Sequence, residues 1–288
     1  MKTILGLIGG GERDAVILQT AFAAAAPLSA HLEFLHIHVS AGIAARYDDA
    51  VQFAVGAAIG DSLDKLTGKA QEFSKAAADH VREFCAALNI EVCAAPADHK
   101  KVTANFREQN DASTESLIYE ARQNDLVVLG RASQTQGLSP DTLERMVRNC
   151  ARPVLLAATA APRTLTDTVM VCWQKSDNVV RAVAVAMPLL KKARRVVFTS
   201  VATHNKDSTE TEDDLIRQCA QSGVLTETQI IPSNHGRIPS LLATAAKDCN
   251  ADLVVMGAYG RSRLHELIFD SCTNALLRDI DRPILLMH

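Results

Sequence analysis

The sequence predicts an α/β fold in which two copies of one domain follow each other along the chain. The first observation is a repeated phrase: 125–130 reads DLVVLG, and 252–257 reads DLVVMG. A second phrase, RPVLL at 152–156, returns as RPILL at 282–286. The other observation is a strict alternation of short Val-, Ile- and Leu-rich runs with longer segments of helical length. This pattern is typical of a parallel sheet with helices on both faces, so each half should hold five strands.

The second half shows this alternation most clearly. Its expected strands are 168–173, 195–200, 225–230, 252–256 and 283–287, and its expected helices are 178–190, 209–221, 238–249 and 264–278. Strands such as 253–256, reading LVVM, lack polar alternation and should be covered on both faces. Right-handed crossovers through the helices would then place all strands parallel.

The first half gives the same series with one addition. In chain order, strands and helices are expected at 3–8, 15–26, 32–38, 63–88, 91–95, 113–123, 126–129, 138–150 and 153–157. Residues 40–62 form a long connection, which could be a lid, an interface or a neutral insertion. The predicted domains are therefore 1–158 and 168–288, joined by a linker over 159–167.

Composition excludes several classes of function. The formal net charge is −3 and the pI about 6.3, which gives no electrostatic footprint for nucleic acid or a membrane surface. No apolar stretch is long enough to span a bilayer. Seven scattered cysteines without a Cys-x-x-Cys motif fit reduced thiols, so we expect a cytoplasmic protein. His36 and His38 share one face of a strand, but two histidines are a weak metal signal, and no metal site is expected.

The candidate ligand site lies at the carboxyl ends of the strands, where open α/β sheets bind their ligands. The fourth strand of the second half runs into 257–263, which reads GAYGRSR and precedes a helix. Glycines allow close backbone approach, and a helix N-terminus favours phosphate. A tight turn that needs glycine for its φ angles is the alternative explanation.

This segment resembles the signature of the universal stress protein family: a strand, Gly-x-x-Gly, nine residues, then Gly and Ser or Thr. Here Gly257 and Gly260 are followed by nine residues and by Asp270-Ser271. The resemblance covers the chain as two tandem domains. It implies a Rossmann-like, adenine nucleotide alpha-hydrolase-like fold. Many members bind ATP or AMP, and others bind no nucleotide.

The resemblance assigns the nucleotide to six residues of the second half. Gln174 would meet the base, and the other five would form the phosphate end: Gly257, Gly260, Arg261, Ser262 and Ser271. Two departures matter. Asp270 replaces the third glycine and would bring a carboxylate towards phosphate unless a cation such as Mg²⁺ intervened. Gln174 replaces an aspartate that contacts adenine and ribose. ATP or AMP, with or without magnesium, and no cofactor at all are therefore equally plausible.

The first half departs further from the family pattern. Its first strand ends in Gly9-Gly10-Gly11-Glu12, with Gly9 where the aspartate would stand. Its fourth strand ends in Gly130-Arg-Ala-Ser133, which lacks the second glycine. The triple glycine also lacks the serine and aspartate of the nucleotide pyrophosphatase loop. We therefore expect a degenerate site and a structural role for this half.

The resemblance implies a stress-adaptation binding protein with at most one adenine nucleotide site, in the C-terminal half. The alternatives are an interaction or scaffold module without nucleotide, and a weak ATPase. No nucleophile–base pair stands at a suitable spacing, so no catalytic residue is assigned. The resemblance implies pairing of the final strands, 154–157 and 284–287, within one chain as an intramolecular pseudo-dimer. A homodimer is then permitted but not required.

Overall fold

The computed structural model describes residues 1–37, 57–95, 100–110, 113–131, 138–174, 176–202, 209–233, 237–258 and 276–288. The first half holds, in chain order, β1 (Thr3–Ile8), α1 (Asp14–Ala25), η1 (Ala26–Leu28), β2 (His31–Ile37), α4 (Ala57–Ala87), β3 (Glu91–Val92), β4 (Thr103–Gln109), α5 (Thr114–Arg122), β5 (Leu126–Leu129), α6 (Pro140–Asn149) and β6 (Val154–Leu156). The second half holds β7 (Thr168–Cys172), α7 (Asp177–Leu190), β8 (Arg195–Ala202), α8 (Thr209–Gln221), β9 (Thr226–Pro232), α9 (Ile238–Asp248), β10 (Leu253–Gly257) and β11 (Ile284–Met287).

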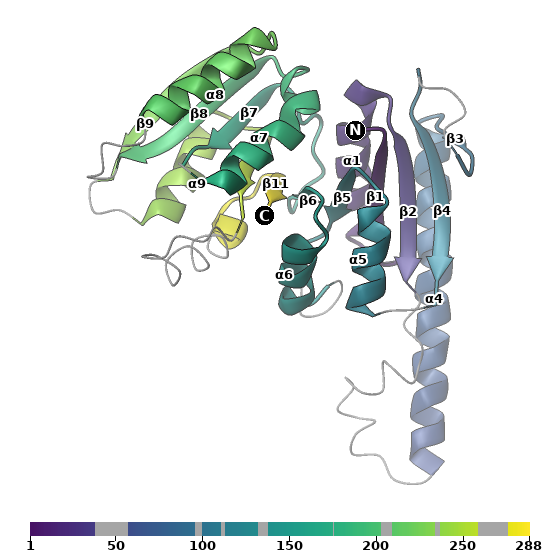
Figure 1. Ribbon diagram of the computed structural model, residues 1–288. Helices are drawn as coiled ribbons and strands as arrows, with labels where there is room; N and C mark the ends of the chain where they lie inside the picture. Colours follow the sequence, from purple (N-terminus) through teal and green to yellow (C-terminus); the bar gives the residue numbers. More distant parts are fainter. Residues whose placement is uncertain are drawn as a thin grey trace.

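All of these strands form one continuous sheet, in the order β3-β4-β2-β1-β5-β6-β11-β10-β7-β8-β9 (Figure 1). Within each half the pairs are parallel, and the first strand lies between the second and the fourth. The order therefore reverses beside β1 and beside β7, which puts the two switch points at equivalent places. The α/β fold class predicted from the sequence is confirmed.

The halves join through their last strands. β6 and β11 pair antiparallel, with Leu155 opposite Leu285. Both side chains are fully buried in the same apolar cluster. The expected pairing of the final strands within one chain is confirmed.

Helices cover both faces of the sheet. Side chains of α1, α4, α7 and α8 pack into one apolar cluster, and those of α5, α6 and α9 into the other. Serine caps begin several helices: the Ser113, Ser139 and Ser176 side chains each accept a backbone N–H from the first turn. Pro140 occupies the first position of α6, where its missing N–H costs nothing.

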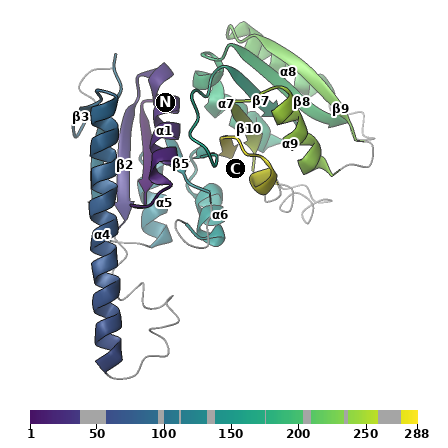
Figure 2. The same ribbon diagram turned by 180° about the vertical axis from the view of Figure 1, so that it is seen from behind.

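The structure corrects the first half in three places. The third strand of its main series is β4, not 91–95, and β3 is a two-residue strand added at the edge. The sequence of β4 lacks the apolar pattern of a buried strand, because Asn105 and Arg107 bond to Glu33 instead of entering the core. The expected connection of 40–62 is also too long, because α4 already begins at Ala57. α4 projects well past the sheet in both views (Figures 1 and 2).

Candidate functional site

The second half brings the ends of β7 and β10 together with the start of α7. β7 and β10 are neighbours in the sheet, so Gln174 and Gly257 reach the same edge. Gln174 is exposed at this edge. The other predicted nucleotide contacts lie outside the described residues: Gly260, Arg261, Ser262 and Ser271. Asp270 lies outside them as well.

Gly257 has a packing role that the sequence did not indicate. A Cβ atom here would lie 2.8 Å from the Val179 backbone nitrogen and 2.9 Å from the Asn178 Cβ. The Asn178 Nδ2 also donates to the Ala258 carbonyl at 2.7 Å. The glycine therefore lets β10 approach the first turn of α7, a requirement that is independent of any ligand.

Two buried polar groups at this edge lack hydrogen-bond partners within the described part of the chain. The Trp173 indole N–H follows β7, and the residue is only 5% exposed. The Thr199 hydroxyl lies in β8 and is fully buried. Buried donors normally find an acceptor, so an unpaired indole N–H beside a candidate site requires an explanation. Sequence reasoning missed Trp173, although it is the only tryptophan of the chain and directly precedes Gln174.

The triple-glycine turn of the first half is occupied by a carboxylate of its own chain. The Asp14 carboxylate accepts the N–H of Gly9 at 2.9 Å and that of Gly10 at 2.8 Å. The His80 Nδ1 lies 2.9 Å from the same carboxylate, which is almost completely buried. The backbone groups that could bind a phosphate are thus already paired with an internal anion.

Helix α4 closes this turn from outside. Gly10 has a φ of +82°, and a Cβ here would lie 2.1 Å from the Phe73 backbone carbonyl oxygen. Only glycine meets both conditions. The glycines of this turn therefore serve the packing of α4.

Arg131, which follows β5, joins the two halves. Its guanidinium donates to the Ala157 carbonyl at 3.1 Å and, across the boundary, to the Arg282 carbonyl at 3.0 Å. It also donates to the carbonyls of Leu277 and Ile280. These acceptors lie at the C-terminal end of the last helix and just after it, where a cation is favoured.

The space beside Arg131 is too small for a nucleotide. A cavity of about 60 Å³ lies between Gly130, Ile17 and Thr159, whereas ligand pockets occupy roughly 300–1,000 Å³. Across the junction, Thr159 donates to the Asp281 carboxylate through its N–H at 3.0 Å and its hydroxyl at 2.6 Å. These bonds lower the pKa of Asp281. Arg131 and Thr159 thus serve the contact between the halves.

A hydroxyl, an imidazole and a carboxylate line up between β2 and β4. The His31 Nδ1 lies 2.7 Å from the Thr103 Oγ1, and its Nε2 lies 3.0 Å from the Glu33 Oε1. This order resembles the nucleophile, base and acid of a catalytic triad, but Thr103 and His31 are almost completely buried. A substrate could not reach the hydroxyl, so the arrangement is structural.

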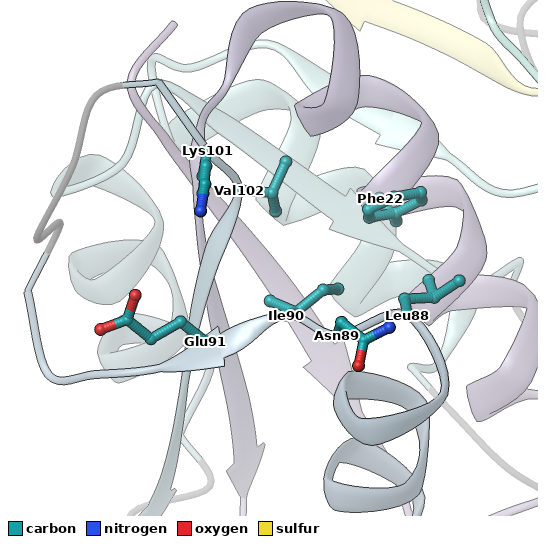
Figure 3. Close-up of a pocket in the computed structure, with 7 residues that line it drawn as sticks. All are labelled: Phe22, Leu88, Asn89, Ile90, Glu91, Lys101 and Val102. Carbon is teal, nitrogen blue, oxygen red and sulfur yellow. The ribbon is translucent and has the colours of Figure 1, made fainter.

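A cavity of about 450 Å³, larger than the one beside Arg131, lies next to β3 and β4 in the first half (Figure 3). Phe22, Ile90 and Val102 form apolar walls, and Glu91 and Lys101 lie at its rim. The cavity is at the amino ends of β3 and β4, where it meets the C-terminal part of α1. Helix C-termini repel anions, so this is a poor phosphate site.

No group of three or more metal-ligating side chains occurs among the described residues. His36 is buried and its Nδ1 lies 2.9 Å from the Ile8 carbonyl, which gives it a structural role. His38 lies outside the described residues. In the same described ranges, no helix is long and apolar enough to cross a membrane.

Comparison with known proteins identifies the second half. Residues 166–288 match the model of the universal stress protein family. They belong to that family. This universal stress protein domain includes β7 to β11 and the edge that carries Trp173, Gln174 and Gly257. No curated protein sequence matches the chain.

Solved structures extend the likeness of fold to the whole chain. A universal stress protein from Archaeoglobus fulgidus DSM 4304 is 15% identical, with a TM-score of 0.64, and the match covers 99% of this chain and 95% of that one. A functionally unknown protein from Pseudomonas aeruginosa PAO1 is 16% identical, with a TM-score of 0.56, and the match covers 100% and 92%. A putative universal stress protein from Pseudomonas aeruginosa UCBPP-PA14 is 15% identical, with a TM-score of 0.56, and the match covers 100% of this chain and 93% of that one. At these identities the likeness concerns the fold.

Proposed function

We propose that this chain is a tandem universal stress protein that acts by binding. Its two domains, 1–158 and 168–288, have different roles. The second domain holds one adenine nucleotide, ATP or AMP, and the first supports it. The observation that carries this proposal is the unpaired indole N–H of Trp173 at the carboxyl edge of β7. A ligand that accepts a hydrogen bond there would satisfy it.

The loops that follow the first strand of each half differ, and this difference supports a single site. In the first domain, Asp14 pairs with the backbone N–H groups and α4 closes the turn. In the second domain, Gln174 is exposed beside β10 and can both donate and accept hydrogen bonds to a base. We assign the phosphate end to Gly260, Arg261, Ser262 and Ser271 from the family pattern alone.

A binding role fits the described residues better than catalysis. The one hydroxyl–imidazole–carboxylate series among them, through Thr103 and His31, is buried. We propose that any hydrolysis of ATP is slow and incidental. A scaffold module without nucleotide is the second candidate, because Arg131, directly after β5, bonds to the junction between the halves.

Trp173 provides a direct test because it is the only tryptophan of the chain. ATP with magnesium should change its fluorescence, and calorimetry on the same samples should give one site per chain. Trp173→Phe keeps an aromatic ring and removes the N–H, so calorimetry should show affinity reduced about fivefold to tenfold, the loss of one hydrogen bond. The smaller phenyl ring should lower the thermal unfolding midpoint only modestly, because the indole N–H has no hydrogen-bond partner among the described residues.

Thr199→Val is the matched control, since it removes the other unpaired polar group on the opposite face of the sheet. It should leave ATP affinity unchanged. Two nucleotides per chain would contradict the single-site proposal. No heat and no fluorescence change with either ATP or AMP would refute nucleotide binding and favour the scaffold.

A further inference from the structure

Strand β9 forms the outer edge of the second half and carries no partner strand on its far side among the described residues. It is seven residues long, and both views place it at the margin of the molecule (Figures 1 and 2). The opposite edge is β3, which has only two residues. A long open edge presents unpaired backbone groups and is a template for another strand.

The direction of these backbone groups follows from the pairing with β8. The Val196 N–H donates to the Leu225 carbonyl, and Val196 stands opposite Thr226. Backbone groups alternate along a strand, so odd-numbered residues of β9 bond to β8. Thr226, Thr228 and Ile230 therefore direct their N–H and C=O groups away from the sheet.

Usual protections against edge pairing are weak on β9. Proteins block such edges with lysines, prolines or bulges. The single charge within β9 is Glu227, and Arg195 pairs with it through hydrogen bonds of 2.9 and 2.7 Å. Pro232 stands only at the end of the strand. Ile230 is 61% exposed and Leu225, just before the strand, is 77% exposed.

We propose that β9 pairs antiparallel with β9 of a second copy of this chain, about a two-fold axis at Thr228. This register sets Thr226 opposite Ile230 and lets all three outward-facing residues exchange both backbone bonds. It also sets the exposed Leu225 opposite the half-buried Ile231, so two aliphatic side chains meet. The strand is thus complementary to itself, which is what an isologous dimer requires.

The two neighbouring registers of this strand pair are less favourable than the one centred at Thr228. An axis at Glu227 would place two carboxylates directly opposite each other. An axis at Gln229 would set Thr226 against Pro232, which has no N–H to donate. The axis at Thr228 avoids both costs. The proposal does not depend on nucleotide binding.

Thr228→Pro on the full chain tests the surface. The Thr228 N–H points outward, so proline should spare the bonds to β8, and proline is tolerated at such edge positions. Sedimentation velocity should show a dimer for the wild type, and a dissociation constant raised about tenfold or more for the variant, through two lost hydrogen bonds. Thr114→Pro is the matched control, because Thr114 is the first residue of α5, where proline is favoured.

Disulfide trapping tests the register independently of folding losses. Opposed Cα atoms of a hydrogen-bonded antiparallel pair lie about 5.5 Å apart, within reach of a disulfide. Thr228→Cys should cross-link under mild oxidation above the wild-type background, and Gln229→Cys should not. A wild type that stays monomeric, a Thr228→Pro dimer of unchanged strength, or equal cross-linking at both positions would overturn the proposal.

Discussion

At Asp14, a single carboxylate satisfies backbone donors that a phosphate could otherwise occupy. It pairs with the N–H groups of Gly9 and Gly10 and with His80. The equivalent loop of the second half begins with Gln174, which is exposed. The turns after β1 and β7 stand at equivalent places in the sheet, but in the first half the Asp14 side chain fills its turn.

Glu33 shows how a partly buried charge makes stability depend on pH. Burial raises the pKa of its carboxyl group, but hydrogen bonds and charge from His31 and Arg107 outweigh this and lower the pKa below 4.5. Arg107 is held in turn by Glu120, at 2.7 Å. The group connects β2, β4 and α5.

We predict that this carboxylate stabilises the fold above pH 4.5, its unfolded value, and that the contribution is lost as the pH falls through the lower folded pKa. Glu33→Gln should therefore flatten the acid side of a plot of unfolding free energy against pH, measured by urea titration. Glu91→Gln, at an exposed position of β3, is the control and should keep the wild-type slope. Equal slopes for Glu33→Gln and wild type would contradict the prediction.

At the scale of elements, the junction of β6 and β11 turns two sheets into one. Leu155 and Leu285 stand opposite each other and are fully buried. The strands are short, three and four residues, so the junction rests on few side chains. Their packing, more than their backbone bonds, should hold the halves together.

Leu155→Ala and Leu285→Ala should each lower the unfolding free energy by about 2–5 kcal/mol, because each leaves a cavity in a packed cluster. The double variant should lose less than the sum, with a coupling of roughly 0.5–3 kcal/mol for side chains in contact. Urea unfolding of all four proteins measures this coupling. Val92→Ala, at an exposed edge position, should change little. Strict additivity of the two leucine substitutions would argue against this register.

At the scale of the whole molecule, the strands of two unequal halves form one sheet. Arg131 joins the halves, and Thr159 bonds to Asp281 beside it. Burial lowers the pKa of the Arg131 guanidinium, and the Asp281 charge opposes this. The halves should therefore unfold together.

Trp173 fluorescence reports the second half, whereas far-UV circular dichroism reports both. In the wild type we expect the two urea transitions to coincide. Arg131→Met leaves several carbonyls without a donor and should lower the unfolding free energy by roughly 2–4 kcal/mol and separate the two transitions. Arg163→Met, in the exposed linker, should neither lower the unfolding free energy nor separate the two transitions. Coincident, unshifted transitions in Arg131→Met would show that the arginine does not join the halves.

The sequence by itself determined the α/β class, the two-fold repeat, most strand positions and the unequal glycine loops. These follow from local periodicity and from comparison of one half with the other. Only the tertiary structure decided that β4 is a strand, that Asp14 fills the first turn, that Gly257 makes room for α7, and that Arg131 crosses the junction. Each depends on partners far away in the chain. Side-chain periodicity records which face of an element is apolar, and it carries no information about which distant backbone group a polar side chain will meet.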